Sequence, residues 1–250
     1  MSLVEGWRGW EGLEARERLV VALDFVSGGE ALQLVERLDG QCRWFKVGME
    51  LFYAEGGGRG VVDALRGLGY EVFLDLKLHD IPNTVAGAVR SLEATGASLL
   101  TVHAGGGEAM MRAARDAVRG QALRLLAVTV LTSMDAGQMR GVGVRDEPME
   151  QVLRLGRMAA GAGMDGMVCS AEEVGSLRGE VGDGPLLVVP GIRPAGAELG
   201  DQRRVAGPGE ALGRGASMLV VGRPITQAPD PGAAMAAILD EMQREINGVI

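Results

Sequence analysis

The sequence predicts a single (β/α)₈ barrel, and three observations support this. Its 250 residues are the usual length of that fold. From Leu19 onward, a short apolar run, a turn and a longer segment with helical spacing repeat eight times, as parallel βα units do. No Gly-x-Gly-x-x-Gly follows the first apolar run, which favours a closed barrel over an open doubly wound sheet. We therefore expect an N-terminal extension at 1–18 and a barrel domain at 19–250.

The eight expected strands are short and mostly apolar, because parallel strands are buried on both faces. They cover Leu19 to Asp24, Arg43 to Gly48, Glu71 to Leu76, Ser98 to His103, Arg124 to Leu131, Gly166 to Ser170, Leu186 to Pro190 and Met218 to Gly222. Segments between them carry apolar residues at i, i+3 and i+4, which predicts helices. Five of these are Glu30 to Leu38, Thr84 to Ala94, Glu108 to Val118, Met149 to Ala160 and Ala233 to Ile246. The segment 1–18 is polar with two tryptophans, and we expect a short helical extension packed outside the barrel.

Composition excludes several classes of partner. The net charge of −8 and the pI near 5.0 argue against nucleic acid, which is bound mainly through basic residues. No apolar run of about 18 residues and no secretion leader is present, so we expect a cytoplasmic protein without a membrane span. Cys42 and Cys169 lie far apart with no Cys/His cluster, which predicts neither a disulfide framework nor a zinc site.

The candidate functional residues lie at the ends of the expected strands. In (β/α)₈ barrels the active site is formed at the C-terminal ends of the strands, and a soluble barrel core does not need polar side chains there. The polar residues at these ends are Asp24, Lys46, Asp75, Lys77, His103, Thr132, Ser133, Arg193 and Arg223, the last of which follows Gly222.

The third expected strand carries the strongest signal. Side chains alternate faces along a strand, so Asp75 and Lys77 share one face. Pro82 favours the first position of a following helix, which places Asp80 in the connection instead of beside Lys77. Lys46 and Lys77 are the only two lysines among 25 Lys and Arg residues. Since lysine can release its proton and arginine hardly can, these positions indicate acid–base chemistry, with chance placement at ordinary salt bridges as the alternative.

The connection at 191–207 is long and rich in glycine and arginine, and we expect it to act as a lid. Together the ends of strands seven and eight are a frequent phosphate site in this fold. Arg193 and Arg223 are therefore expected to bind a phosphate, with a solvated surface position as the alternative for each. For His79 and His103 a structural role is favoured over a catalytic one.

The motif Asp75-x-Lys77-x-x-Asp80-Ile81-Pro-Asn-Thr84 resembles the orotidine 5′-phosphate decarboxylase family. The resemblance covers the chain from about residue 19 onward. It extends to five further elements: Ala22-Leu-Asp24, Phe45-Lys-Val-Gly48, Leu131-Thr-Ser133, Pro190-Gly-Ile-Arg-Pro194 and Val221-Gly-Arg-Pro-Ile-Thr226.

The resemblance implies decarboxylation of orotidine 5′-monophosphate to UMP and CO₂, the last step of de novo pyrimidine synthesis, without a metal or an organic cofactor. Lys77 would protonate C6 of the pyrimidine, and Asp75 would lie near the substrate carboxylate. Whether Asp75 strains the substrate or mainly orients Lys77 stays open. Lys46 would complete an alternating Lys–Asp–Lys–Asp array and would contact the ribose together with Asp24.

The resemblance also implies a homodimer, with Asp80 contributed to the site of the neighbouring subunit. Ile81 and Thr84 would reach the same shared site. The remaining implied contacts are Thr132 with the pyrimidine edge, Arg193, Gly222 and Arg223 with the phosphate, and Gln202 with both phosphate and base when the lid closes.

Three alternative functions stay in view. A Mg²⁺-dependent sugar-phosphate lyase of the same superfamily, such as a 3-keto-L-gulonate 6-phosphate decarboxylase or a hexulose-phosphate synthase, has an acidic metal ligand where this chain has Lys46. A non-catalytic phosphate-ligand sensor has no need for Lys77 beside Asp75. A Schiff-base aldolase needs a neutral lysine, which flanking carboxylates disfavour.

Overall fold

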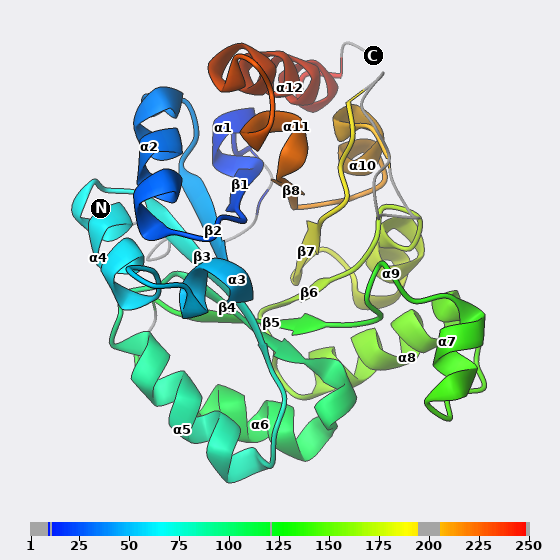
Figure 1. The fold of residues 1–250 in the computed structure, drawn as a ribbon. Helices are drawn as coiled ribbons and strands as arrows, with labels where there is room; N and C mark the ends of the chain where they lie inside the picture. The colour runs from blue at the N-terminus through cyan, green and yellow to red at the C-terminus, as the bar shows by residue number, and fades with distance from the viewer. Residues whose placement is uncertain (1–9, 11, 121, 195–205, 249–250) are drawn as a thin grey trace.

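The eight strands close into one parallel barrel, as predicted. The computed structural model describes residues 10, 12–120, 122–194 and 206–248. Each strand pairs in parallel with the next, and the last pairs with the first (Figure 1). The strands are β1 (Leu19–Leu23), β2 (Trp44–Gly48), β3 (Glu71–Leu78), β4 (Leu99–His103), β5 (Arg124–Val128), β6 (Gly166–Val168), β7 (Leu186–Val189) and β8 (Met218–Val221).

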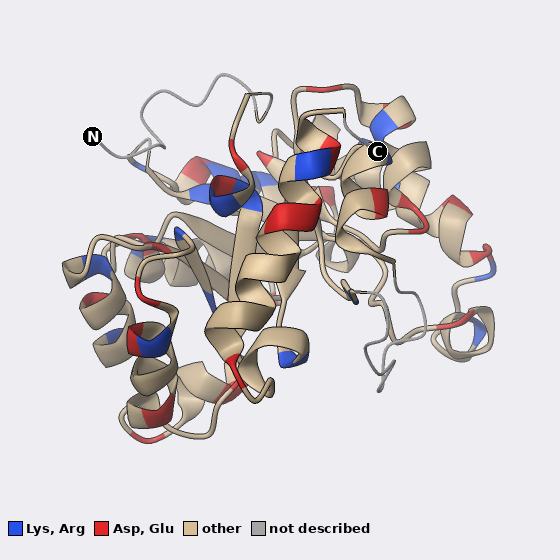
Figure 2. Ribbon diagram, turned by 90° about the horizontal axis from the view of Figure 1, so that it is seen from above, with Lys and Arg blue, Asp and Glu red and all other residues tan. Residues whose placement is uncertain are grey.

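Helices surround the barrel and cover its outer face (Figure 1). They are α1 (Ala15–Arg18), α2 (Gly28–Leu38), α3 (Met49–Tyr53), α4 (Arg59–Gly67), α5 (Pro82–Glu93), α6 (Glu108–Ala117), α7 (Ala136–Gly141), α8 (Pro148–Gly161), α9 (Val174–Val181), α10 (Pro208–Gly213), α11 (Arg223–Thr226) and α12 (Pro231–Ile246), with a 3₁₀ turn η2 (Ala104–Gly106) after β4. Blue and red residues are interspersed along these outer helices (Figure 2). Within the described residues, no helix combines the length and the apolar character that crossing a bilayer requires.

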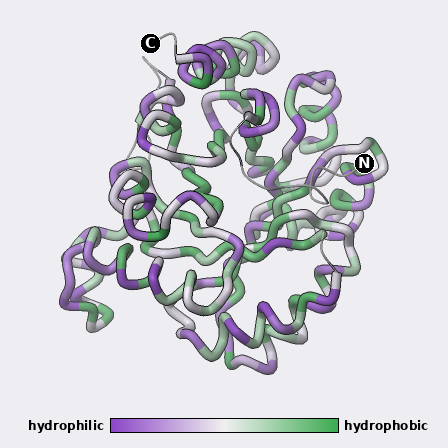
Figure 3. The backbone as a smooth tube through the Cα atoms, turned by 180° about the vertical axis from the view of Figure 1, so that it is seen from behind, coloured by the Kyte–Doolittle hydropathy of each residue, from purple (hydrophilic) through white to green (hydrophobic). Residues whose placement is uncertain are grey.

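Two apolar clusters hold the barrel together. On β1, Leu19, Val21 and Leu23 face outward and pack with residues of the surrounding helices. Val20 and Ala22 face inward and join a cluster of strand residues inside the barrel. This alternation is the one that a strand requires. The hydrophobic strands accordingly lie at the centre of the molecule, whereas the helices show alternating hydrophilic and hydrophobic stretches (Figure 3).

The element bounds differ from the predicted ones mainly at the strand ends. Strand β3 continues two residues further than expected, to Leu78, whereas β5 ends at Val128 instead of Leu131. Strand β6 is only three residues long, and its last residue, Val168, pairs with Val128. The chain after Val128 therefore has no further residue of β6 to pair with. The predicted helices are present within two residues at each end, and Pro82 begins α5 as expected.

The N-terminal end of the barrel is closed by residues that precede β1. The guanidinium groups of Arg18 and Arg178 lie over the Trp10 ring, 4.9 and 5.1 Å from its centroid, and the ring packs against the interior cluster. Arg18 donates hydrogen bonds to the carbonyls of Ser217 and Ala216 at 2.9 and 2.6 Å. Burial, and then the charge of Arg178, lower the pKa of Arg18 to about 10. The division into an extension at 1–18 and a barrel at 19–250 stays a prediction.

Candidate active site

A cavity of about 410 Å³ opens at the C-terminal ends of the strands, where the fold predicts a site. That volume is in the range of small-molecule pockets. Every strand except β4, or the connection that follows it, contributes to the wall. The lining residues are Ala22, Asp24, Lys46, Phe73, Asp75, Lys77, Val128, Val130, Leu131, Thr132, Val168, Cys169, Pro190, Gly191, Arg193, Val220, Gly222, Arg223, Thr226 and Gln227.

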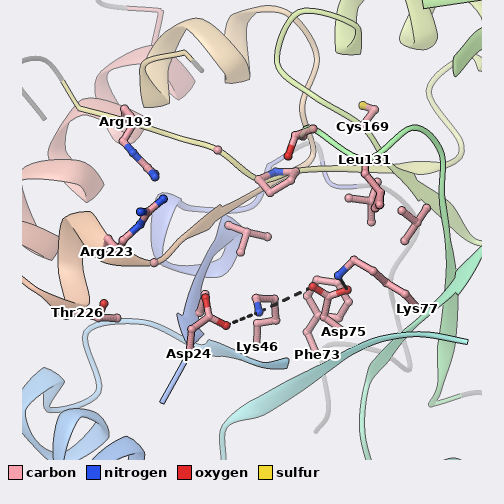
Figure 4. A pocket seen from close by; sticks show the side chains of 18 of the residues that line it. Asp24, Lys46, Phe73, Asp75, Lys77, Leu131, Cys169, Arg193, Arg223 and Thr226 are labelled. Atoms are coloured by element: carbon pink, nitrogen blue, oxygen red, sulfur yellow. Dashed lines mark hydrogen bonds and ion pairs between the residues drawn. The ribbon is translucent and has the colours of Figure 1, made fainter. Parts of the chain in front are cut away.

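Acidic and basic side chains alternate along one wall of this cavity (Figure 4). Lys46 Nζ lies 2.9 Å from Asp24 Oδ1 and 3.8 Å from Asp75 Oδ2. Lys77 Nζ lies 2.8 Å from Asp75 Oδ1. The order Asp24, Lys46, Asp75, Lys77 follows the order of the strands, because β1, β2 and β3 are neighbours in the barrel. The four charges therefore form one connected array, which we call the charged array.

The charges around Asp75 keep it ionised. Burial alone raises the pKa of a carboxyl group. At Asp75 that effect is outweighed by the charges of Lys46 and Lys77 and by hydrogen bonds from Lys77 and Thr101, so its pKa lies below the ordinary 3.8. A carboxylate at this position holds an ammonium group on either side at neutral pH.

The backbone at Lys77 departs from a regular strand. Its φ of 49° lies in the left-handed region, which costs a non-glycine residue on the order of 1–3 kcal/mol. The prediction that Asp75 and Lys77 share a face is confirmed, since both line the cavity and form an ion pair. The strand reaches that arrangement through an irregular backbone, which simple alternation does not predict.

Gly48, at the end of β2, leaves room for the charged array. A Cβ atom at this position would lie 2.8 Å from Lys46 Nζ and 3.2 Å from Asp24 Oδ1. Any larger residue would displace the ion pair between these two side chains. The close approach of Lys46 and Asp24 therefore explains why the Phe45-Lys-Val-Gly48 element ends in glycine.

Two arginines occupy the other side of the cavity. Figure 4 shows Arg193 and Arg223 on the same side, pointing toward each other and well separated from the charged array. The backbone N–H of Arg193 donates to the carbonyl of Ala206 at 3.0 Å, which fixes the start of the connection after β7. Arg223 begins α11, directly after Gly222. Two guanidinium groups converging on a cavity suit an anion such as a phosphate.

Eight of the residues expected from the sequence line the cavity. They are Asp24, Lys46, Asp75, Lys77, Thr132, Arg193, Gly222 and Arg223. Asp80, Ile81 and Thr84 do not line the cavity of their own chain; they are exposed on the rim after β3. Asp80 Oδ1 accepts a hydrogen bond from the Ile81 N–H at 2.6 Å. Gln202 and most of the expected lid lie outside the described residues.

Sequence reasoning missed the apolar part of the wall and two polar residues. Thr226 and Gln227 follow Arg223 and line the cavity beside it. Thr226 belongs to the Val221-Gly-Arg-Pro-Ile-Thr226 element, but no role for its side chain was expected from the sequence. The missed apolar residues are Phe73, Val128, Val130, Val168, Cys169 and Val220. Their position at strand ends was the available signal, but an apolar residue there is indistinguishable from ordinary core.

The two histidines stack on each other beside the site. The rings of His79 and His103 lie 5.2 Å apart at an interplanar angle of 17°, and His103 Nδ1 accepts from the Gly105 N–H at 3.1 Å. Burial first, and then His79 and Lys77, lower the pKa of His103. Neither histidine lines the cavity. In the described part of the chain, no three His, Cys, Asp or Glu side chains gather as a metal site would require.

The fold and the cavity together define a class of protein: (β/α)₈-barrel enzymes with a charged site at the strand ends. Residues 17–238 match the model of the orotidine 5′-phosphate decarboxylase / HUMPS family, and the chain belongs to this family. It is 54% identical to the orotidine 5′-phosphate decarboxylase of Anaeromyxobacter sp. (strain K), over 90% of this chain and 98% of that protein. It is 53% identical to that of Chromohalobacter salexigens, over 90% and 95%.

Solved structures give the same picture. The crystal structure of orotidine 5′-phosphate decarboxylase from Lactobacillus acidophilus matches with a TM-score of 0.79 and 40% identity, over 90% of this chain and 99% of that one. An uncharacterized conserved protein from Geobacillus kaustophilus matches with a TM-score of 0.77 and 36% identity, over 90% and 99%. The family expected from the motifs is therefore confirmed.

Proposed function

We propose that this chain decarboxylates orotidine 5′-monophosphate to UMP and CO₂ in pyrimidine biosynthesis, and that it does so in the cytoplasm. The observation that carries the proposal is the charged array facing two arginines across one cavity. An enzyme that decarboxylates the base of a nucleoside monophosphate needs cations that hold the phosphate and a proton donor at the distant base. The names of the most similar relatives support the same activity.

In the proposed reaction Lys77 is the proton donor. The bond between C6 and the carboxylate carbon breaks, its electron pair stays at C6, and a proton from Lys77 forms the new C–H bond as CO₂ leaves. The ammonium group also stabilises the developing negative charge at C6. Asp75 orients Lys77 through the 2.8 Å ion pair. Lys77 then regains its proton from water.

The other lining residues bind the remainder of the nucleotide in this proposal. Arg193 and Arg223 hold the phosphate together with the backbone of Gly222, and Thr132 contacts the pyrimidine edge. Asp24 and Lys46 lie between these two ends, where the ribose would pass. Gln202 is proposed to join phosphate and base. Phosphate binding energy can then be used at the reacting carbon, since it positions the base against Lys77.

We further propose that the active unit is a homodimer in which Asp80 completes the partner's charged array. Asp80 lies on the exposed rim with Ile81, which is 67% exposed. Val26, Met49 and Tyr53, which follow β1 and β2, are exposed apolar residues on the same rim. Because β1, β2 and β3 are neighbours in the barrel, these residues follow adjacent strand ends, where an exposed apolar patch would suit a subunit interface. In this arrangement Ile81 and Thr84 also reach the shared site.

A metal-dependent sugar-phosphate lyase is the second candidate, because the family model covers more than one activity by name. In this chain Lys46 lies between the carboxylates of Asp24 and Asp75, the groups that a Mg²⁺ ion would need as ligands. A cation already in that position repels a metal ion. The ion pairs therefore favour the metal-independent reaction.

The deciding experiment incubates EDTA-treated protein with orotidine 5′-monophosphate and follows the loss of the orotate chromophore by ultraviolet absorbance. We expect rapid loss with UMP as product, unchanged by added Mg²⁺. No loss from folded protein, together with Mg²⁺-dependent turnover of a sugar phosphate, would establish the lyase instead. Nucleotide binding without any turnover would indicate a non-catalytic sensor.

Subunit exchange tests the shared site. Lys77→Ala and Asp80→Ala proteins are each expected to be inactive. Mixing them should restore activity, because a hybrid dimer contains one site with both native residues. If activity stays absent although mass spectrometry shows subunit exchange, Asp80 acts within its own chain.

A further inference from the structure

Strands β3 and β4 fall out of register beside the charged array. Leu74 pairs with Leu100, but the next pair is Leu78 with Val102. Three residues of β3, Asp75 to Lys77, therefore face a single residue of β4, which is Thr101. Extra residues in one strand are a β-bulge, and bulges next to active sites redirect side chains.

The Thr101 hydroxyl group joins the two reactive residues of this bulge. Thr101 Oγ1 accepts a hydrogen bond from the backbone N–H of Lys77 at 2.9 Å and donates one to Asp75 Oδ1 at 3.0 Å. A hydroxyl group has one proton and two lone pairs, so both bonds can exist together. Thr101 is fully buried and does not line the cavity. Thr101 therefore contacts the charged array from within the protein and not from the cavity.

Both bonds fall on atoms whose position decides the geometry of the array. The N–H of Lys77 belongs to the residue with the left-handed backbone, and the Thr101 hydroxyl replaces the ladder acceptor that the bulge removes. Asp75 Oδ1 is the same oxygen that pairs with Lys77 Nζ at 2.8 Å. The Thr101 side chain thus fixes the backbone from which the Lys77 side chain extends and the carboxylate that holds the Lys77 ammonium group.

We propose that Thr101 is a positioning residue for the reaction, which holds Lys77 and Asp75 in the geometry for proton transfer to the substrate. This inference rests on the proposed decarboxylation. Thr101 touches no substrate, so its loss should lower kcat and leave KM nearly unchanged.

Three substitutions test this. Thr101→Val keeps the shape of the side chain but can neither accept from Lys77 nor donate to Asp75. We expect kcat for orotidine 5′-monophosphate to fall about 10- to 100-fold, the size of effect that a small misplacement of a reacting group causes, with KM within about threefold. Thr101→Ser restores the hydroxyl group and should recover kcat to within about threefold of wild type.

Thr129→Val is the matched control. Thr129 is also a buried threonine, and its hydroxyl group donates to the Val168 carbonyl at 2.8 Å instead of to the array. The same substitution there should leave kcat within about twofold of wild type. A general loss of barrel packing would lower kcat in both valine variants alike.

The pH profile of kcat gives a second readout. Asp75 is faced by Lys46 of β2 and Lys77 of its own strand, with Asp24 of β1 beyond Lys46, and the Thr101 hydroxyl is its partner from β4. Losing the donated hydrogen bond makes the carboxylate easier to protonate. The acid limb of the kcat profile should move to higher pH in Thr101→Val and return in Thr101→Ser.

The wild-type protein is measured first, which separates this inference from the proposed function. If wild type does not turn over orotidine 5′-monophosphate, the proposed function is wrong and the positioning role falls with it. If wild type is active and folded Thr101→Val keeps its kcat, only the inference on Thr101 is overturned. Should Thr101→Val fail to fold, Thr101→Cys takes its place, because a thiol of similar size is a much weaker donor and acceptor; the same loss of kcat is expected, and an unchanged kcat overturns the proposal.

Discussion

Strand β3 has an acidic side chain toward each end, and each of these is bound by two cationic side chains and one hydroxyl group. The cations are arginines at one end and lysines at the other. At its start Glu71 is bound by Arg43 at 3.3 Å, by Arg66 at 2.6 Å and by the hydroxyl group of Ser98. Ser98 directly precedes β4. Glu71 is thus held by two cations and by one hydroxyl group from the β4 side.

Toward the other end Asp75 is bound by Lys77 at 2.8 Å, by Lys46 at 3.8 Å and by the hydroxyl group of Thr101 at 3.0 Å. Asp75, Lys46 and Lys77 line the cavity, and Glu71 does not. Arginine stays protonated at any relevant pH and suits a permanent ion pair, whereas lysine can give up its proton. The two ends of β3 thus differ in their cations: arginines hold the acid at the start of the strand, and lysines hold the acid at the end that we propose performs the chemistry.

The largest expected effect is the loss of Lys77. If Lys77 acts as proposed, Lys77→Ala removes both the proton donor and the positive charge near C6, so kcat should fall by about 10⁴-fold or more. Binding of UMP, measured by calorimetry, should stay within about tenfold of wild type, because the arginine side is intact. Near-normal turnover would remove Lys77 from the mechanism.

Glu71→Gln tests the structural end. Removing the negative charge leaves Arg43 and Arg66 without their shared carboxylate and should lower the free energy of unfolding by about 3 kcal/mol, which lowers Tm by roughly 6–12 °C. The kcat at 25 °C should stay within about twofold of wild type. A large fall in kcat with unchanged Tm would reverse the roles assigned to the two ends.

The acid dependence of stability should separate Asp75 from other carboxylates. Because its pKa is lowered on folding, its contribution to stability is complete above the ordinary pKa of 3.8 and is lost as the pH falls through the lowered folded value. Urea unfolding of wild type and Asp75→Asn between about pH 6 and pH 2 measures this. The difference in unfolding free energy should be constant at the upper pH values and shrink below 3.8. A difference independent of pH would contradict the assignment.

Arg66→Lys should have the smallest effect. Arg66 is partly exposed and also donates to the Tyr70 carbonyl at 2.8 Å, a second bond that lysine makes less well. We expect a loss of less than about 1 kcal/mol in stability and an unchanged kcat. A clear loss of activity would mean that the cation at this end also serves the chemistry.

The charged array could be predicted because its signals are local in sequence. The spacing of Asp75 and Lys77 predicts one face, and the polar ends of neighbouring strands predict that Asp24 and Lys46 join them. The left-handed backbone at Lys77 and the contacts of Thr101 with this strand could not be predicted, because a bulge depends on how two strands pair and leaves no pattern in either strand alone.

The bounds of the elements show a similar limit. The run from Arg124 to Leu131 predicts one strand, yet β5 ends at Val128, because both partner strands, β4 and β6, end opposite that residue. Apolar residues such as Cys169 look like core in the sequence, and only barrel closure turns them into cavity wall. The exposed position of Asp80 agrees with its predicted place in the connection, while its action across a dimer stays a prediction.

The most direct test of the account is the turnover of Lys77→Arg on orotidine 5′-monophosphate. This variant keeps a positive charge beside Asp75 but replaces a group that can release a proton with one that hardly can. If Lys77 is the proton donor, kcat falls at least about 100-fold while UMP binding and Tm stay close to wild type. A kcat close to wild type would show that positive charge alone suffices at this position, and that Lys77 is not the proton donor.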